Sequence, residues 1–485
     1  MYFTGIDIGT GSAKAVLINT AGNIICTAQQ HYSFNEPAPG HREQDADVVK
    51  HAAFAVIKEI MSRCDKPDKI QAICFSAAMH SIMAVNENGR PLTPLLLWSD
   101  TRSIKEAEDI RRNKAHSTLI YQRCGTPIHP MLPLTKIKWL QKNEKEIFYA
   151  AYKFISIKEY ISFHLLGRYI IDYSIASATG MFDIHELKWN KTALQYAGIN
   201  EGLLSEPVPV SFSAYDWKAE IRDALHLPAN IAFVIGSSDG CFANTGSKVS
   251  PIHDLAVTVG TSAAVRLTTP EPVMDADESI FNYVLADNLF ISGGASNNGG
   301  NIIDWLKNFL KMDALTDADI LEKAFKIEAG CDSLIILPYL YGERAPVWDA
   351  NAKMIVHGMQ AHHTQEHFCR AMIEGVVMNL YCIAEKIIKH QPGIKKIIAS
   401  GGFIQSPQWL QLVADVCNLP VHVMDNTDAS ALGAALWGGF SLGMFDKEIF
   451  TAGQPVYIYT PDELKHIIYM KNYAVFKELY NRNKL

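Results

Sequence analysis

Several features are missing from this sequence of 485 residues, and each absence excludes a class of protein. No basic stripe runs along it: 44 Lys and Arg stand against 51 Asp and Glu, a net charge of −7, which argues against a nucleic-acid partner. The longest uncharged stretch rich in Gly, Ala and Leu, residues 429–445, is shorter than the roughly 20 apolar residues of a membrane span. We therefore expect a buried helix and its turn there, and no contact with a membrane.

Cysteine pairs and a secretory signal are missing as well. Nine cysteines are spread through the chain without a CxxC motif, which favours a reducing compartment over a disulfide framework. The first residues lack the basic and apolar segments of a signal peptide. These observations predict a cytoplasmic protein. Hydrophobic residues make up 48% of the chain and charged residues 20%, the balance of an ordinary globular protein.

The beginning of the chain has the pattern of an α/β protein. Apolar, β-prone runs predict strands at residues 2–8, 13–19 and 24–31, separated by glycine turns. Apolar side chains at helical spacing predict a helix over 45–64, and a buried strand follows at 70–75. The order of strands, helix and strand favours an α/β fold that begins with an antiparallel meander. Near the other end, residues 460–485 have the pattern of an amphipathic helix.

Part of the first pattern recurs in the second half of the chain. An apolar run at 255–259 breaks at Gly260-Thr261-Ser262 and resumes at 263–268, as the first strands do around Gly9-Thr10. Two such units predict two similar α/β domains, residues 1–246 and 247–485, that face each other across a cleft. A chance match of two short turns is the alternative.

An acid on a strand and a glycine turn form the first constellation that could carry chemistry. Asp7 lies near the end of the first predicted strand, and the turn after it supplies backbone amides and hydroxyls. Such a turn can hold phosphate oxygens while the carboxylate holds a hydrated Mg²⁺. The spacing matches neither a Walker A loop nor GxGxxG, and an ordinary hairpin turn is the alternative. The residues of the turn and the following strand are Gly9, Thr10, Gly11, Ser12 and Lys14.

A second acid, Asp239, follows the apolar run 231–235 and a Gly-Ser-Ser turn. In α/β proteins, a carboxylate between a strand end and a helix start lies at the mouth of a cleft. There it can act as a general base that takes a proton from a substrate hydroxyl during phosphoryl transfer. Helix capping by the same side chain is the alternative.

Polar and aromatic residues after the strand at 70–75 suit a polyhydroxylated ligand. Met79 and His80 come just after that strand, and Trp98, Asp100 and Arg102 alternate with small polar residues farther on. Together they offer an aromatic wall, hydrogen-bond donors and an acceptor. A lone histidine in such a place is more often structural, which is the alternative.

Three further motifs complete the set. Gly401 and Gly402 precede an amphipathic helix and could let a flat ring lie against the backbone. The charged stretch 342–349 is either an ion-paired turn or part of the cleft. His363 and His367 match a zinc-protease pattern, but Thr364 has the features of an N-cap, which places His363 outside the helix and disfavours a zinc site.

In this order, along nearly the whole chain, the motifs resemble those of the FGGY family of carbohydrate kinases. The resemblance implies two ribonuclease-H-like domains of the actin and hexokinase type, with MgATP and a sugar bound in the cleft between them. The chain departs from the second family signature near residues 354–358. The matching segments are residues 5–14, 131–143 with its Pro-Leu-x-Lys-x-x-Trp-Leu pattern, 236–240, 258–261, 342–349 and 401–402.

The resemblance also implies a role for each matched position. Asp239 would deprotonate the sugar hydroxyl that attacks the γ-phosphoryl group of ATP, and Asp7 would organise Mg²⁺. Arg102 and His80 are the candidates for binding a substrate carboxylate. The phosphates would be held at Gly9, Thr10, Gly11, Ser12, Lys14, Gly260 and Thr261, the adenine at Gly401, Gly402 and Ser406, and the substrate at Met79, His80, Trp98, Asp100 and Arg102.

Within the family, the substrate segments look most like the gluconokinase branch. Segments 125–131 and 297–300 favour it, whereas xylulokinases share the Met79-His80 pair and Asp239. The expected reaction is ATP-dependent phosphorylation of the terminal hydroxyl of a sugar acid, D-gluconate to 6-phospho-D-gluconate, by a protein that could form a homodimer. A kinase for xylulose or another ketose or polyol is the nearest alternative. A non-catalytic sugar-binding regulator and an assembly ATPase are more remote ones.

Overall fold

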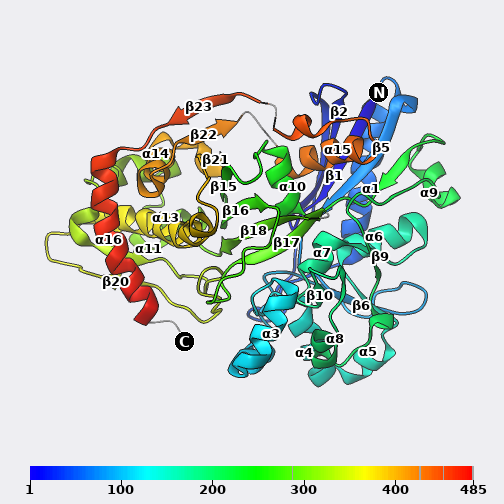
Figure 1. The fold of residues 1–485 in the computed structure, drawn as a ribbon, viewed down its shortest axis with the longest axis horizontal. Coiled ribbons are helices and arrows are strands. Elements are labelled where there is room, and N and C mark those ends of the chain that lie inside the picture. The colour runs from blue at the N-terminus through cyan, green and yellow to red at the C-terminus, as the bar shows by residue number, and fades with distance from the viewer. Residues whose placement is uncertain (287, 425–427, 452, 483–485) are drawn as a thin grey trace.

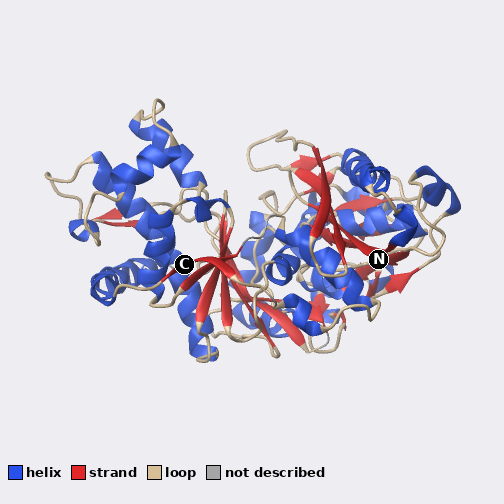
Figure 2. Cartoon of the chain, turned by 90° about the horizontal axis from the view of Figure 1, so that it is seen from above, coloured by secondary structure: helices blue, strands red, loops and turns tan. Residues whose placement is uncertain are grey.

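Two β-sheets form the framework of the chain in a computed structural model that describes residues 1–286, 288–424, 428–451 and 453–482 (Figure 1). Figure 2 shows them as two separate groups of strands with helices around both. The first sheet has the order β13 (Ser213–Ala214), β14 (Ala232–Val234), β5 (Ile70–Ala77), β1 (Tyr2–Ile8), β2 (Ser12–Asn19) and β3 (Ile24–His31). The second has the order β17 (Phe281–Ala286), β18 (Leu289–Ser296), β16 (Ala263–Thr269), β15 (Asp254–Val259), β21 (Lys396–Ser400), β22 (Val421–Met424) and β23 (Pro455–Tyr459).

The two sheets repeat one topology. In the first, β1 pairs antiparallel with β2 and parallel with β5. In the second, β15 pairs antiparallel with β16 and parallel with β21. An antiparallel strand closes the same edge in both, β13 beside β14 and β23 beside β22. The recurring glycine turn therefore reflects a repeat of the fold and not a chance match.

The strands and the helix predicted for the beginning of the chain are confirmed, with β5 running two residues beyond its predicted end. Helix α1 (Ala46–Arg63) begins after Asp45, whose side chain accepts hydrogen bonds from the amides of Asp47 and Val48. Strand β5 is buried along nearly its whole length. Helix α1 packs on one face of the first sheet, and α15 (Ala429–Ser441) packs on the other. The central strands of this sheet are therefore apolar on both faces.

A helix from the last part of the chain packs on the first sheet. Helix α15 lies against β1 and beside α10 (Asp239–Gly246), as Figure 1 shows. Glycines allow this close approach: a Cβ on Gly5 would lie 1.9 Å from the Ala431 oxygen, and a Cβ on Gly433 2.2 Å from the Phe242 oxygen. The helix predicted within residues 429–445 is therefore confirmed, and it ties the end of the chain to its beginning.

The remaining elements surround the two sheets. In the first half they are β4 (Glu43–Gln44), β6 (Met83–Val85), β7 (Leu95–Leu96), α2 (Ile104–Arg112), α3 (Lys114–Cys124), α4 (Pro133–Asn143), α5 (Lys145–Ala150), β8 (Lys153–Ile155), α6 (Ile157–Leu166), β9 (Ile170–Asp172), α7 (Tyr173–Ser177), β10 (Phe182–Asp183), β11 (Lys188–Trp189), α8 (Lys191–Ala197), β12 (Glu206–Val208) and α9 (Ala219–Ala224). In the second half they are α11 (Asn301–Leu310), α12 (Asp317–Ala324), β19 (Ile335–Leu337), β20 (Ile355–His357), α13 (Gln365–His390), α14 (Pro407–Cys417) and α16 (Glu463–Arg482). Helix α16 confirms the helix predicted near the C-terminus. In the part of the chain that the structure describes, no helix has both the length and the apolar character needed to span a bilayer.

Candidate functional site

A cavity of about 280 Å³ lies between the two halves of the molecule. Both sheets contribute to its wall: Thr10 follows β1, Asp239 begins α10, and Arg266 and Tyr283 come from β16 and β17. Binding sites for small molecules begin at about this volume, so the cavity suits one compact ligand. Further lining residues are Met79, His80, Trp98, Met131, Ala295, Arg344 and Trp348.

Asp239 presents its half-buried carboxyl group to this cavity. The N-cap of α10 is Ser238, whose hydroxyl accepts the amide of Cys241, so capping does not depend on Asp239. One Asp239 oxygen accepts a hydrogen bond from the Gly240 amide at 2.7 Å. Burial raises the pKa of the carboxyl group, which makes it a better proton acceptor.

Asp7 places a second acid close to Asp239. Its Oδ1 accepts a hydrogen bond from the Ser76 hydroxyl at 2.7 Å. The pKa of Asp7 is raised to about 7, mainly by burial and to a smaller extent by repulsion from the Asp239 carboxylate. Two acidic groups that interact in a buried setting repel each other, and a divalent cation with oxygen ligands would relieve that repulsion. The donor set therefore fits Mg²⁺.

The turn after β1 is tight and is held from the side. The Gly9 amide donates to the Ser12 carbonyl at 3.0 Å. The Thr10 hydroxyl accepts the indole N–H of Trp98 at 3.1 Å, which connects the turn to the cavity wall. A Cβ on Gly11 would meet open space, so this part of the turn is accessible to a ligand.

Ser12 and Lys14 continue the turn into β2. The Ser12 hydroxyl accepts a hydrogen bond from the Gln29 side chain at 3.1 Å. Lys14 forms an ion pair with Asp428, just before α15, with 2.6 Å between Nζ and Oδ1. Part of the Lys14 charge is therefore neutralised, and the pair links the first turn to the end of the chain.

A second and larger cavity, of about 670 Å³, lies beside the corresponding turn of the second half. Its volume is within the range of cofactor sites. Gly401 adjoins it with a φ of +95°, and a Cβ there would lie 2.5 Å from the Val259 oxygen, so the backbone approach requires glycine. The residues predicted to bind the nucleotide that line this cavity are Gly260, Thr261, Gly402 and Ser406.

His80 lines the small cavity together with Met79, but its ring carries no charge. Its Nδ1 lies 2.7 Å from the Ala178 carbonyl oxygen and its Nε2 3.2 Å from the Tyr283 hydroxyl. Because a carbonyl can only accept, Nδ1 carries the proton and Nε2 accepts from Tyr283. Burial, followed by the nearby Lys136 ammonium, lowers the pKa of His80 to about 3. The expectation that His80 supplies positive charge to a substrate carboxylate does not hold.

Asp100 and Arg102 pair with each other and are not among the residues that line the cavity. Arg102 donates to the Asp100 carboxylate at 2.8 to 3.0 Å and to Glu43 at 2.6 Å. Its guanidinium also lies over the Trp139 ring, 5.2 Å from the centroid. Two carboxylates already neutralise Arg102, so the expectation that it binds a substrate carboxylate does not hold either.

The positive charge of the cavity comes instead from two arginines that the sequence motifs did not single out for this role. Arg344 donates from Nε to the Asn297 side chain at 2.8 Å and from Nη2 to the Ser296 carbonyl at 3.1 Å. Its guanidinium lies over the Trp98 ring, 4.6 Å from the centroid. The sequence allowed two interpretations of residues 342–349, an ion-paired turn or a part of the cleft. The structure supports the second, because Arg344 and Trp348 line the cavity.

Arg266 is the second arginine, on β16. The only signal for it in the sequence is its position: it is the one charged residue in the strand Ala263–Thr269, a few residues after the Gly260 turn. Nothing in the sequence alone indicates that this side chain reaches the same cavity as Asp239.

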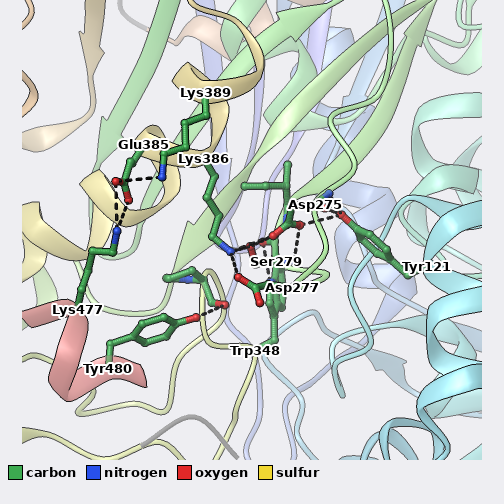
Figure 3. A network of polar contacts seen from close by, with 12 residues as sticks. Tyr121, Asp275, Asp277, Ser279, Trp348, Glu385, Lys386, Lys389, Lys477 and Tyr480 are labelled. Carbon is green, nitrogen blue, oxygen red and sulfur yellow. Dashed lines mark hydrogen bonds and ion pairs between the residues drawn. The ribbon is translucent and has the colours of Figure 1, made fainter. Parts of the chain in front are cut away.

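A polar network beside the cavity includes Trp348 of its wall (Figure 3). The indole N–H of Trp348 donates to the Ser279 carbonyl at 2.8 Å. Lys386 donates to the Ser279 hydroxyl at 2.7 Å and to Asp275 at 2.9 Å, and Tyr121 of α3 donates to Asp275 at 3.1 Å. Because Tyr121 belongs to the first half of the chain and the others to the second, the network joins the two halves next to the cavity.

The histidines of the zinc-like motif are occupied by helix capping. Thr364 is the N-cap of α13, as predicted, and His363 lies before the helix. The Nδ1 of His363 accepts the Gln360 amide, and the Nδ1 of His367 accepts the Thr364 amide. These contacts occupy the Nδ1 atoms of the pair. Among the described residues, the group whose ligand atoms lie close enough to hold a metal ion is Asp332, His362 and His363, and His367 is not part of it.

Known proteins resemble this chain over nearly its whole length. The model of the FGGY family of carbohydrate kinases, N-terminal domain, matches residues 2–246, and that of the C-terminal domain matches residues 255–442. A gluconokinase from Bacillus subtilis is 38% identical over 456 residues, which cover 92% of this chain and 88% of the relative. Crystal structures of a gluconate kinase and of a ligand-bound xylulose kinase, both from Lactobacillus acidophilus, each match with a TM-score of 0.94 and 31% identity over 99% of this chain and 98% of theirs.

These matches agree with the repeated sheet topology and with the order of the motifs. They confirm the predicted architecture, two α/β units of the ribonuclease-H-like type found in actin and hexokinase. The expectation of a carbohydrate kinase is confirmed as well. The chain belongs to the FGGY family of carbohydrate kinases.

Proposed function

We propose that this carbohydrate kinase transfers the γ-phosphoryl group of ATP to the terminal hydroxyl of D-gluconate and releases 6-phospho-D-gluconate. The observation that carries the proposal is the small cavity, in which the carboxylate of Asp239 is combined with Arg266 and Arg344. A carboxylate suits proton removal from a hydroxyl, and two arginines suit an acidic sugar better than a neutral one. The name of the 38% identical relative, a gluconokinase, supports the same substrate.

In this proposal Asp239 is the general base. It accepts the proton of the sugar hydroxyl while that oxygen attacks the γ-phosphorus in line with the departing ADP. Its raised pKa supports this role. Phosphoryl transfer needs mainly positioning and charge neutralisation, so no covalent intermediate with the protein is required. Trp98 and Trp348 flank the cavity and would exclude water, which limits wasteful hydrolysis of ATP.

ATP would occupy the larger cavity, with its phosphates towards the two glycine turns. Gly260 and Thr261 line that cavity at one side, and Gly402 and Ser406 at another, where they would border the adenine. The accessible Gly9 to Gly11 turn would approach the phosphates from the first half. Backbone amides of such turns are suited to phosphate oxygens.

Asp7 would hold Mg²⁺ through water, which fits the raised pKa of this buried acid. When bound, the ion would neutralise phosphate charge. The protein itself contributes the Ser76 hydrogen bond that orients the Asp7 carboxylate.

A panel of substrates tests the proposal. The purified protein is assayed with ATP and D-gluconate, D-xylulose, L-ribulose or glycerol, and ADP release is measured in a coupled assay. We expect kcat/KM for D-gluconate to exceed the others by at least about tenfold, since a matched charged group contributes about 1.5–3 kcal/mol. ADP release without any sugar would indicate an assembly ATPase, and its absence with every sugar would indicate a non-catalytic regulator.

A xylulose kinase is the second candidate. Support for it comes from the Lactobacillus acidophilus xylulose kinase, which resembles this chain as closely as the gluconate kinase does. A higher kcat/KM for D-xylulose than for D-gluconate in the same panel would select this candidate.

A further inference from the structure

Arg266 has no partner of its own in the cavity. In the part of the chain that the structure describes, its Nε is buried without a hydrogen-bond partner, and no carboxylate forms an ion pair with it. Arg344 differs, because Asn297 and Ser296 hold its guanidinium in place. An arginine lining a cavity without a partner is available to a ligand, and leaving it unpaired is costly.

The strand register explains how Arg266 reaches the cavity. It lies opposite Gly293 of β18, and Gly293 in turn pairs with Phe281 of β17. A Cβ on Gly293 would lie 2.2 Å from the Val265 oxygen, so the strands approach each other closely there. Arg266 and Phe281 on either side of Gly293 both line the cavity. The guanidinium lies close to α10, since a Cβ on Gly240 would lie 3.4 Å from its Nε and 3.5 Å from its Nη2.

Among the residues that line the cavity, positively charged side chains outnumber negatively charged ones. Arg266 and Arg344 contribute two positive charges, and Asp239 contributes one carboxyl group. His80 is neutral because burial lowers its pKa to about 3. Burial lowers the pKa of Arg344 only to about 10, so this side chain is charged at neutral pH.

We infer that Arg266 binds the carboxylate of the sugar acid and thereby selects an acidic sugar over a neutral ketose or polyol. The inference rests on the proposed function and names the residue that sets its specificity. The planar guanidinium offers parallel N–H donors to both carboxylate oxygens, a geometry that a neutral sugar cannot use. A neutral sugar in the same place would leave Arg266 buried and unpaired, which lowers its affinity.

The test compares two substrates that differ in one group, a carboxylate against a neutral carboxamide. D-Gluconate and D-gluconamide have the same hydroxyl groups, but the amide is neutral. In Arg266→Gln we expect KM for D-gluconate to rise by about 10- to 100-fold, with KM for D-gluconamide and for ATP changed less than about threefold. Arg266→Lys keeps the positive charge but loses the two parallel N–H donors of the guanidinium. It should bind D-gluconate more tightly than Arg266→Gln and more weakly than the wild type.

A control and a binding measurement exclude a simple loss of folding. Arg168→Gln removes an exposed arginine that pairs with Asp216 on the surface, and it should leave all constants unchanged. Thermal melting of each variant checks that the fold is intact. Calorimetric titration of D-gluconate without ATP should show the same 10- to 100-fold weakening in Arg266→Gln.

The outcomes separate this inference from the proposed function. Equal losses with D-gluconate and D-gluconamide would overturn the inference, because Arg266 would then act on the transferred phosphoryl group. Unchanged binding of D-gluconate in Arg266→Gln would overturn it as well. Wild-type protein that binds D-gluconate but does not phosphorylate it would overturn the proposed function alone, and wild-type protein that does not bind it would overturn both.

Discussion

The two glycine turns of this kinase join equivalent strands, but the first turn, Gly9 to Ser12, is one residue longer than the second, Gly260 to Ser262. After β1, the Gly9 amide donates to the Ser12 carbonyl at 3.0 Å, and after β15 the Gly260 amide donates to the Ser262 carbonyl at 2.9 Å. Each turn joins a central strand to its antiparallel neighbour. The repeat of the fold is therefore visible at the level of single hydrogen bonds.

The side chains just before the turns share a position and differ in chemistry. Two residues before each glycine, Asp7 is hydrogen bonded to Ser76 at 2.7 Å and Thr258 to Ser400 at 2.8 Å. In both cases the serine lies in register on the parallel neighbouring strand. The first half thus has an acid where the second has a neutral hydroxyl.

The difference divides the proposed chemistry between the two halves. The first half supplies the acids Asp7 and Asp239, whereas the second supplies Arg266 and Arg344. A cavity between two such surfaces can hold a substrate that needs both a base and a positive charge. One repeated backbone thereby supports two complementary electrostatic roles.

The largest effect is expected from removing the base of the first half. Asp239→Asn should lower kcat by about 10²- to 10⁴-fold, because the general base is lost, while ATP affinity measured by calorimetry stays within about threefold. Ser238→Ala is the matched control: it removes the helix cap and a hydrogen bond from Ser174 but no carboxylate, so it should cost about 1–2 kcal/mol of stability and keep most of kcat. More than a tenth of kcat retained in Asp239→Asn would contradict the assignment.

Giving the first turn the side chain of the second tests the comparison directly. Asp7→Thr should lower kcat by about 10²-fold, since a charged group that organises the metal is lost. Thr258→Val changes the equivalent position of the second turn and should cost less than about tenfold. Both are measured at saturating Mg²⁺ with the preferred sugar. Equal losses in the two variants would mean that the halves do not differ as inferred.

A smaller effect is expected at the glycines of the second half. Gly401→Ala introduces a Cβ at a φ of +95° and only 2.5 Å from the Val259 oxygen, so it should destabilise the protein by about 1–3 kcal/mol. Gly402→Ala meets no atom within 4 Å and should leave the melting temperature nearly unchanged. Calorimetry of the two variants measures the difference, and equal melting temperatures would contradict the strained backbone.

The smallest effect concerns pH. Because the pKa of His80 is about 3, its ring is neutral at every pH above that value and changes no charge between pH 5 and 9. We therefore expect the pH profiles of KM for the sugar to have the same shape in wild type and His80→Gln. A step near pH 6.5 that only the wild type shows would mean that the ring is charged in the working enzyme.

Local signals in the sequence predicted the framework well. The meander, helix α1, the recurring turn and the α15 helix all follow from apolar spacing and glycine positions, which act within a few residues. The family resemblance also placed Met79, His80, Trp98, Thr10 and Asp239 at one cleft between the two halves. Those residues do line one cavity.

The charge of individual side chains was predicted less well. Arg102 was expected to be free for a substrate, but Glu43 and Asp100 neutralise it, and Glu43 lies 59 residues away in sequence. His80 was expected to supply charge, but burial keeps it neutral. Both errors arise because a motif does not show which distant groups pack around a side chain.

The sequence by itself determined the family, the repeated α/β design and the position of the acids, because these depend on short patterns and their order. Only the tertiary structure decided which cations remain unpaired. Nothing in the sequence distinguishes the charge environment of Arg102 from that of Arg266. The fold places two carboxylates beside Arg102, whereas among the described residues none lies within ion-pair distance of Arg266. Electrostatic interactions depend on distance in space and on burial, and the fold sets both.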